Sequence, residues 1–388
     1  MDSESWAPAG LPAREYLLVL LTAAATTFLL TGLVRLLAFR VGAVAYPRQR
    51  DVHVEPMPRM GGVAMYGGVL AAIFLASNLP ALSRGFTYSN DAWAAVAAGG
   101  LIVLVGALDD RFELDSLTKL AGQVTSAGIL VIAGVQWFVL WVPWGGSEDS
   151  VGQLMVLSSN QGQLLTVLLT VAMINAMNFV DGLDGLASGI GLISATATFV
   201  FCLGVLDRQN GDVNAYPPAL IAAAIAGACL GFLPYNFQPA KLFMGDSGSM
   251  LIGLMLATAS TSASGRMLTN DVDPSDTIAL LSPLLVVAAV LFVPLLDLIM
   301  AVVRRTKAGK SPFHADKMHL HHRLLEIGHS QRRAVLLIYL WAAVISFGAV
   351  SLTLFNAVVV AWVVGLGVLL AAIISVIPRM RARAERES

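Results

Sequence analysis

Two adjacent aspartates, Asp109 and Asp110, end an apolar run of this sequence, and Lys119 follows ten residues after the first of them. Two carboxylates at the carboxyl end of a helix oppose the negative end of its macrodipole, at a cost of roughly 0.3 to 1 kcal/mol each. An unfavourable local placement of this kind is more common at functional sites than elsewhere in a protein. The pair is therefore a candidate for binding a proton or a cation. The alternative is an interfacial aspartate pair exposed to water.

A second motif combines amides and carboxylates, because Asn175, Asn178, Asp181 and Asp184 follow one another at intervals of three, with glycine after each aspartate. This spacing places four oxygen-bearing side chains along one helical face or on a tight turn. Mg²⁺ favours such ligands together with phosphate. An aspartate followed by glycine could instead cap the next helix, but one cap does not need four polar side chains.

A third motif, FMGDSGS at 243–249, precedes another apolar run. Small residues at a helix amino terminus expose backbone N–H groups that can bind a phosphate oxygen. Asp246 within the motif can cap the helix or bind a metal ion. The motif alone leaves these roles open, and its place beside the other motifs favours a functional one.

A short polar segment contains His53 and Arg59, together with prolines and the pair Gly61 and Gly62. Proline fixes the backbone, whereas paired glycines let a backbone or a ligand approach closely. A rigid basic loop is the alternative interpretation, and this segment taken alone favours it.

The segment 304–333 is the longest and most basic loop, and it contains every histidine except His53. It has no HExxH zinc-protease pattern, and His319, His321 and His322 do not share one helical face. Recognition of a phosphorylated substrate fits the segment better, with Arg323 supplying forked donors and the histidines titratable ones.

Long apolar runs must position these motifs. The chain has 388 residues, 57% of them hydrophobic and 13% charged, and a mean hydropathy of +0.75. These values exclude an ordinary soluble domain. A membrane-spanning helix needs roughly 20 apolar residues, and the runs are continuous rather than alternating as in a β-barrel. We therefore predict an all-α polytopic membrane protein with eleven transmembrane helices, at 16–38, 61–79, 92–108, 119–140, 161–178, 186–206, 217–234, 249–263, 277–303, 334–354 and 357–377.

The charge distribution predicts how the chain is oriented, because cytoplasmic loops carry an excess of lysine and arginine. Most of the 24 basic residues fall on one side of the predicted helices, and the opposite side holds only four, namely Arg14, Arg84, Arg208 and Arg266. The sequence thus predicts one membrane domain over 1–388, with 1–15 outside, and with the loop 304–333 and the tail 378–388 in the cytoplasm. All the motifs above fall on the cytoplasmic side, where we expect Mg²⁺-assisted phosphoryl transfer between a soluble donor and a lipid acceptor.

The motifs in this order resemble the polyprenyl-phosphate N-acetylhexosamine 1-phosphate transferases of glycosyltransferase family 4. The aspartate pair, NxxNxxDGLDGLASG, FMGDSGS and the HxHHRL loop match that family from the third predicted helix to the tenth. The resemblance implies transfer of a sugar 1-phosphate from a UDP-sugar to a polyprenyl phosphate in the plasma membrane. It also implies that Asn178 and Asp246 ligate Mg²⁺, with Mn²⁺ as an alternative.

The resemblance assigns further residues to the site. Asp109 and Asp110 match the catalytic pair of the family, and Phe243 would stack on the uracil, whose edge Asp184 would bind. Lys119 resembles the lysine that contacts the diphosphate. The other expected catalytic residues are His321, His322 and Arg323. The other expected substrate-binding residues are Asp181, His53, Arg59 and His319. Because a phosphate monoester is largely dianionic at pH 7, we expect the aspartate pair chiefly to orient Lys119 or the acceptor.

The pattern HLHHRL is similar to the branch that uses UDP-GlcNAc and undecaprenyl or decaprenyl phosphate, and it implies sensitivity to tunicamycin. The branch that uses UDP-MurNAc-pentapeptide usually has three consecutive histidines there.

A transporter would place ionisable groups inside its helices, and a CDP-alcohol phosphotransferase needs residues that the segment 186–189 lacks. No nucleic-acid partner is expected, and a homodimer is among the expected assemblies.

Overall fold

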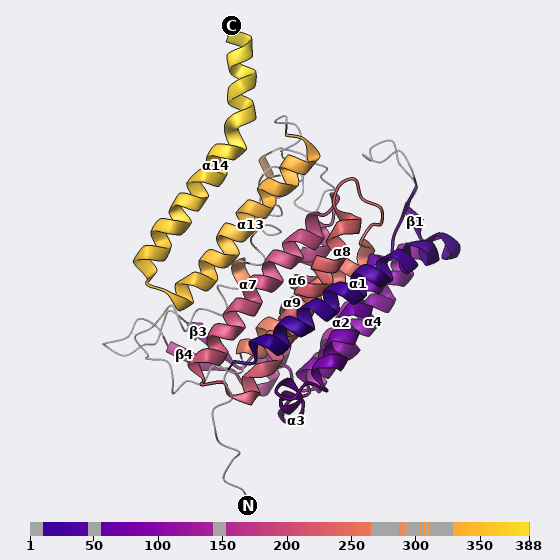
Figure 1. Ribbon diagram of the computed structural model, residues 1–388, viewed down its shortest axis with the longest axis vertical. Helices are drawn as coiled ribbons and strands as arrows, with labels where there is room; N and C mark the ends of the chain where they lie inside the picture. Colours follow the sequence, from indigo (N-terminus) through magenta and orange to yellow (C-terminus); the bar gives the residue numbers. More distant parts are fainter. Residues whose placement is uncertain are drawn as a thin grey trace, which may run out of the picture.

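The computed structural model describes residues 11–45, 56–142, 153–264, 287–289, 292, 303, 306–307, 309 and 329–387. These residues are mostly helical (Figure 1). The α-helices are α1 (Ala13–Val41), α2 (Gly61–Ala76), α3 (Gly85–Tyr88), α4 (Asp91–Phe112), α5 (Ser116–Ile132), α6 (Ser159–Val180), α7 (Leu186–Arg208), α8 (Tyr216–Asn236), α9 (Gly245–Ser264), α13 (Gln331–Leu354) and α14 (Ala357–Glu387). The shorter elements are the 3-10 helices η1 (Leu82–Arg84) and η2 (Val213–Ala215) and the strands β1 (Val44–Ala45), β2 (Met57–Pro58), β3 (Val139–Val142) and β4 (Gln153–Val156).

Seven helices in the described part of the chain are long and apolar enough to cross a membrane: α1, α4, α6, α7, α8 with η2, α13, and α14 up to Val376. Helices α2 and α5 are also apolar but have only 16 and 17 residues, fewer than the roughly 20 that a straight crossing needs. The chain is therefore a polytopic helical membrane protein. The predicted helix at 277–303 falls almost entirely outside the described residues, so the count of eleven is not confirmed.

The predicted helix at 119–140 is wrong in its last turns. Helix α5 ends at Ile132, and Gly134 then adopts a left-handed backbone with φ of 95°. The apolar run continues as strand β3, which pairs antiparallel with β4. Valine and tryptophan in this run favour a strand, and Trp137 just before it is almost fully buried. Apolar character alone does not separate a helix end from a strand.

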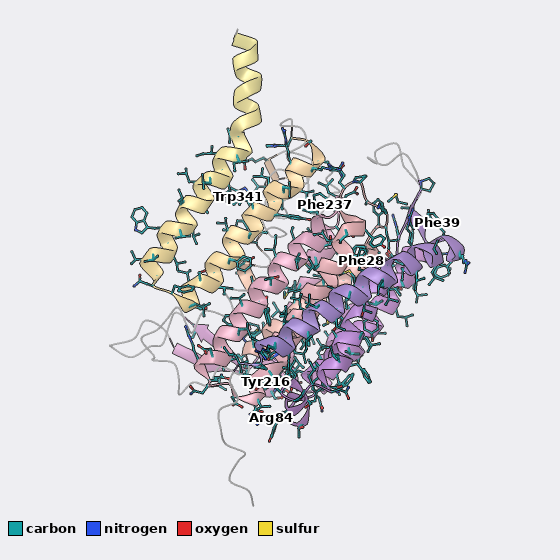
Figure 2. The ribbon with its side chains drawn as sticks, in the orientation of Figure 1. Phe28, Phe39, Arg84, Tyr216, Phe237 and Trp341 are labelled. Atoms are coloured by element: carbon teal, nitrogen blue, oxygen red, sulfur yellow. The ribbon has the colours of Figure 1, made fainter. Side chains whose placement is uncertain are left out.

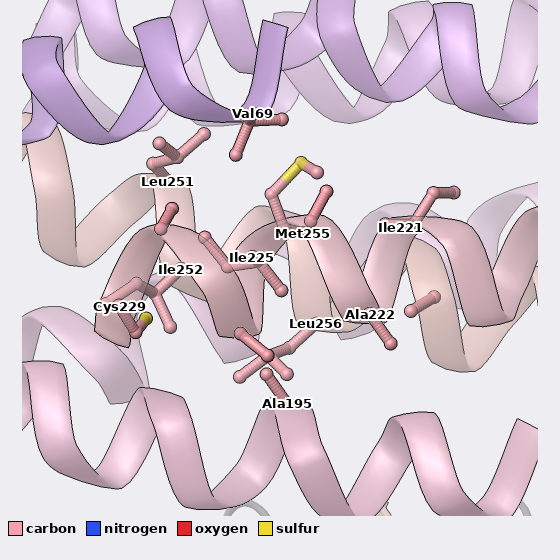
Figure 3. Packing of buried hydrophobic residues seen from close by; sticks show 14 of the residues in the cluster. Val69, Ala195, Ile221, Ala222, Ile225, Cys229, Leu251, Ile252, Met255 and Leu256 are labelled. Carbon is pink, nitrogen blue, oxygen red and sulfur yellow. The ribbon is translucent and has the colours of Figure 1, made fainter. Parts of the chain in front are cut away.

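Helix α9 forms the centre of the bundle, in contact with α2, α4, α6, α7 and α8. Nearly all of its side chains are buried. Figure 3 shows Leu251, Ile252 and Met255 of this helix packed between α8 and neighbouring helices. A central helix that is apolar on all sides is expected where other helices enclose it completely. It gives the polar residues at its amino end a fixed position.

Helix α8 packs closely on α1 through two glycines spaced four residues apart. A Cβ atom on Gly227 would lie 2.2 Å from the carbonyl oxygen of Leu20, and one on Gly231 would lie 2.1 Å from that of Ala24. This is the small-xxx-small packing that lets helix backbones approach within a bilayer. Any side chain at either glycine would force α1 and α8 apart.

The outer surface of the bundle is apolar, as expected for contact with lipid. Phe28 and Phe39 lie on the outer side of α1 (Figure 2), and their side chains are exposed. Helix α14 is the least enclosed span, because only 11% of its apolar window is buried. In contrast, Cys202 and Cys229 are buried and free, in keeping with a packing role.

The two ends of the bundle differ. Helix α3, η1 and the β3–β4 hairpin lie at one end, whereas α14 extends beyond the other (Figure 1). The carboxyl ends of α4 and α6 and the amino ends of α5, α7 and α9 share this second end, because successive helices run in alternating directions. We call it the site end.

Candidate active site

Four helix termini bring polar side chains together at the site end. The carboxyl end of α4 carries Asp109 and Asp110, and that of α6 carries Asn178. The first turns of α5 and α9 carry Lys119 and Asp246. Helices α4 and α6 each pack against both α5 and α9. Lys119 and Asp246 are thereby in contact although 127 residues separate them in the sequence.

The ammonium group of Lys119 bridges two carboxylates. Its Nζ lies 3.1 Å from Oδ2 of Asp109 and 2.9 Å from Oδ2 of Asp246. The Asp109 side chain is only 10% exposed and that of Asp246 is 26% exposed, so solvent ions screen these pairs less than pairs at a free surface. Two carboxylates this close repel each other unless a cation lies between them. The site is therefore built to hold positive charge at this point.

The second oxygen of Asp109 is also engaged. Its Oδ1 accepts a hydrogen bond from the backbone N–H of Leu114 at 2.8 Å. The chain can turn back around this carboxylate because Glu113, the C-cap of α4, has a left-handed backbone with φ of 52°. The Leu114 N–H and the Lys119 cation together offset the unfavourable position of Asp109 at the negative end of the helix.

Asp110 has a different role from that of its neighbour. Its Oδ1 accepts from the backbone N–H of Asp246 at 2.9 Å, and its Oδ2 accepts from the Ser247 hydroxyl at 2.8 Å and from the Ser247 N–H at 3.4 Å. The carboxylate thus caps the first turn of α9. The sequence predicts that this helix terminus offers its backbone N–H groups to a phosphate. For the N–H groups of Asp246 and Ser247 this prediction is wrong, because both already donate to Asp110.

The motif at 175–184 does not present one face. Asn178 Nδ2 donates to Ser249 Oγ on α9 at 3.0 Å and also hydrogen-bonds Asp246. Asn175 points instead to α5, where its Nδ2 donates to Gln123 Oε1 at 2.6 Å. The four side chains do not share one helical face, because α6 ends at Val180. The two aspartates lie in the turn that follows, as in the alternative that the sequence left open. The structure does place Asn178 beside Asp246, as their expected shared role requires.

Asp181 and Asp184 lie in the turn between α6 and α7. Asp184 is 4% exposed, and its Oδ2 accepts from the backbone N–H of Ala240 at 3.0 Å, which ties this turn to the segment before α9. The pKa of Asp181 is raised to about 7, first by burial and then by the charges of Asp246 and Asp110, while the Arg59 cation opposes the rise. Asp181 therefore lies within the electrostatic field of the site.

Phe243 lies beside the segment that leads into α2. Its backbone N–H donates to the Pro58 carbonyl at 2.9 Å, and its carbonyl accepts from the Gly61 N–H at 3.2 Å. The segment that contains Arg59 therefore borders the FMGDSGS motif, as the shared side of the two motifs predicts. The predicted site residues His53, His319, His321, His322 and Arg323 lie outside the described residues.

Sequence reasoning missed Gln123, which is buried between α5, α6 and α9 and pairs with Asn175. The sequence feature that could have identified Gln123 is a single amide side chain within an apolar run, one helical turn after Lys119. It also gave no separate role to Ser247 and Ser249, whose hydroxyls bind Asp110 and Asn178. Their signal was hydroxyl side chains within the first turn of a helix.

The expected Mg²⁺ ligands are few but suitable. Among the described residues, no group of three or more His, Cys, Asp or Glu side chains is arranged to hold a metal ion. Asn178 and Asp246 offer one amide and one carboxylate oxygen, next to the point where the Lys119 ammonium is already bound as a cation. Mg²⁺ is usually held by one or two protein carboxylates together with substrate phosphates and water. The residues therefore fit a metal ion that is completed by a phosphorylated substrate.

Comparison with known proteins agrees with this geometry. The family model of glycosyl transferase family 4 matches residues 92–264, from α4 to α9. The decaprenyl-phosphate N-acetylglucosaminephosphotransferase of Mycolicibacterium smegmatis is 59% identical over 96% of this chain and 91% of its own. The protein of the same name from Mycobacterium tuberculosis is 57% identical, over 97% and 92%. A probable undecaprenyl-phosphate N-acetylglucosaminyl 1-phosphate transferase of Bacillus subtilis is 34% identical, over 84% and 82%.

Proposed function

The chain belongs to glycosyl transferase family 4, and from this premise we propose that it transfers GlcNAc 1-phosphate from UDP-GlcNAc to decaprenyl phosphate. The products are decaprenyl-diphosphate-GlcNAc and UMP. The structural observation that carries the proposal is the Lys119 ammonium held between Asp109 and Asp246, beside Asn178. The mycobacterial relatives favour decaprenyl phosphate over undecaprenyl phosphate, and this choice refines the resemblance found in the sequence.

Asn178 and Asp246 would hold the metal ion, Mg²⁺ or alternatively Mn²⁺, which when bound neutralises charge on the donor diphosphate. Asn178 Nδ2 donates a hydrogen bond to Ser249. The side-chain oxygen of Asn178, Oδ1, is therefore the atom that would bind the metal ion. Asp110 holds the Asp246 backbone in place through the first turn of α9. Each proposed ligand is thus oriented by a second side chain, as is usual at metal sites.

Lys119 would contact the phosphates of the donor, and Asp109 would orient it. Asp109 uses both oxygens, one toward Leu114 and one toward Lys119, and Asp110 uses both toward α9. Neither carboxylate is therefore placed as an unengaged base. The acceptor needs none, because a phosphate monoester with a second pKa near 6 is largely dianionic at pH 7.

The lipid acceptor would approach from the side of the bundle. Phe112, Leu117 and Phe179 flank the site on α4, α5 and α6 and are 64%, 74% and 47% exposed. Such an apolar border suits a prenyl chain within the bilayer, while the polar cluster faces the end of the helices. The donor would enter from the cytoplasm. In this proposal the chain crosses the plasma membrane eleven times, with its amino terminus outside the cell and its carboxyl terminus in the cytoplasm.

The remaining expected donor contacts follow from the resemblance. Phe243 would stack on the uracil, and Asp181 and Asp184 would lie at the nucleotide. Arg59 and His53 would border the acceptor. His319, His321, His322 and Arg323 would supply cations to the phosphates from the loop 304–333. The Asp184 contact with Ala240 supports a role in which this carboxylate also shapes the segment before Phe243.

A donor-swap assay tests the proposal. Purified protein in detergent is incubated with Mg²⁺ and decaprenyl phosphate, plus either UDP-GlcNAc or UDP-MurNAc-pentapeptide, and UMP release is measured. We expect UMP release with UDP-GlcNAc but not with UDP-MurNAc-pentapeptide, and we expect tunicamycin to inhibit that release. The matched control is Lys119→Met, which keeps the length of the side chain and removes its charge. Release from the pentapeptide donor would favour the peptidoglycan branch, and no release from either donor would contradict the proposal.

A further inference from the structure

Gln123 is a buried amide at the junction of the three helices that carry the site. It lies on α5, its side chain is 4% exposed, and it reaches both α6 and α9. Its Oε1 accepts from Asn175 Nδ2 at 2.6 Å, and its Nε2 donates to Asn175 Oδ1 at 3.4 Å. Gln123 Nε2 also lies 3.7 Å from the sulfur of Met250. The two amides thus form a reciprocal pair that joins α5 to α6 against α9.

These contacts lie one helical turn below the site in each helix. Gln123 follows Lys119 by four residues on α5, and Met250 follows Asp246 by four on α9. Asn175 precedes Asn178 by three on α6, which runs in the opposite direction. Residues three or four apart on a helix are stacked neighbours. The pair therefore forms a layer directly beneath the cluster of Lys119, Asn178 and Asp246.

Polar contacts of this kind add to packing in fixing helix positions within a bilayer. Lipid tails are as apolar as leucine, so close packing and hydrogen bonds between helices, rather than the hydrophobic effect, hold membrane helices in place. A reciprocal amide pair is satisfied only when both helices have one relative position. If the Asn175 amide is removed, the buried Gln123 loses its partner on α6, which is costly. Asn175 is exposed and also donates to the Val171 carbonyl at 2.8 Å, so the larger loss is expected at Gln123.

We propose that Gln123 is a positioning residue which, through Asn175, sets α5 against α6 so that Lys119 reaches Asp246 beside Asn178. This role rests on the proposed function. Gln123 is not among the residues expected to contact the substrates. It acts on catalysis only through the place of the Lys119 ammonium. A displacement of about 1 Å in a catalytic group can reduce a rate by about 100-fold.

The kinetic test compares single and compensating variants. Gln123→Leu keeps the bulk and removes the amide, and we expect kcat for UMP release to fall about 10- to 100-fold. The KM for decaprenyl phosphate should stay within about twofold, because the expected acceptor contacts are elsewhere. Gln123→Asn and Asn175→Gln each mismatch the pair by one methylene, whereas the double variant keeps the combined length. Recovery of kcat in the double variant above either single variant supports the proposal.

Thr166→Val is the matched control for general destabilisation. Thr166 is buried on the same helix α6, far from the site, and accepts from the Trp137 N–H at 2.9 Å. We expect Thr166→Val to lower Tm at least as much as Gln123→Leu while kcat stays near the parent value. The proposal is overturned by a parent-like kcat in Gln123→Leu. It is also overturned if losses of kcat track losses of Tm in both variants, or if the double variant gains nothing.

A second measurement does not depend on catalysis. Spin labels at Leu117→Cys on α5 and Phe179→Cys on α6 would occupy exposed positions near the site, and both native cysteines are buried. We expect a narrow label-to-label distance distribution in the parent background and a broader or displaced one with Gln123→Leu. An unchanged distribution overturns the proposal even if the enzyme is active. If the unlabelled parent protein releases no UMP from either donor while the distance distribution changes with Gln123→Leu, the proposed function is refuted and the positioning of α5 is supported.

Discussion

Asp110 Oδ1 accepts a hydrogen bond from the backbone N–H of Asp246 at 2.9 Å. Through this contact, the second aspartate of the pair fixes the start of the helix that carries the expected metal ligand. The first aspartate instead binds Lys119. Two neighbouring residues of the same type therefore serve two different parts of the site, one holding a backbone and the other holding a cation.

The capping role of Asp110 predicts that Asp110→Ala lowers both stability and activity. Loss of an N-terminal cap costs about 1 kcal/mol, and the released start of α9 would also displace Asp246. The matched control is Asp212→Ala, because Asp212 caps η2 by accepting from the Asn214 N–H at 3.0 Å, and η2 contacts α3 at the end of the bundle away from the site. Thermal unfolding should show a loss in both variants, whereas UMP release should fall strongly only in Asp110→Ala. Equal activities in the two variants would contradict the assignment.

The orienting role of Asp109 predicts how Asp109→Asn responds to pH. The variant should lose activity at both pH 6 and pH 8.5, because the amide weakens the hold on Lys119 at either pH. The measurement is the rate of UMP release across this range, divided by that of the parent protein. If activity were lost at pH 6 but recovered at pH 8.5, Asp109 would act as a base and the orienting role would be rejected.

The apolar runs in the sequence predict most of the helices. They do not predict which side chains pair with one another at the site. The runs predict ten of the described helices, and the charge pattern predicts that Asp109, Asn178 and Asp246 share one end. The end of α5 was missed, because residues 133–142 stay apolar while the backbone changes from helix to strand. The partners of Asp110 and Gln123 were missed because they lie on helices distant in sequence, where no local periodicity records which helices touch.

The proposed metal ligands predict graded losses of Mg²⁺ affinity. Asp246→Asn and Asn178→Leu should each raise the Mg²⁺ concentration for half-maximal activity by at least about tenfold, and Ser249→Ala should raise it less, since Ser249 only orients Asn178. The assay titrates Mg²⁺ after treatment with EDTA. Ser260→Ala is the control, because Ser260 lies on the same helix and its buried hydroxyl has no hydrogen-bond partner among the described residues. A parent-like Mg²⁺ requirement in Asp246→Asn would exclude it as a ligand.

The raised pKa of Asp181 predicts a pH dependence of stability. Folding raises this pKa from 3.8 to about 7, so the folded chain binds the proton more tightly than the unfolded chain. The stabilising contribution is complete below about pH 4 and is lost as pH rises through about 7. In EDTA, the Tm of the parent protein should therefore fall more between pH 5 and pH 8 than that of Asp181→Asn. Parallel pH profiles for the two proteins would show that Asp181 does not contribute.

The junction of Gly245 with Asp110 predicts that even a methyl group is harmful there. Gly245 has a left-handed backbone with φ of 70°, and a Cβ atom would lie 2.3 Å from Asp110 Oδ1. Gly245→Ala would strain the backbone and push Asp110 away from the first turn of α9. We expect lower Tm and a loss of UMP release similar to that of Asp110→Ala, with little further loss in the double variant, because both changes break one contact. The control is Gly128→Ala on α5, where a Cβ atom meets nothing within 4 Å and alanine should be tolerated. Additive losses in the double variant would show that Gly245 and Asp110 act separately.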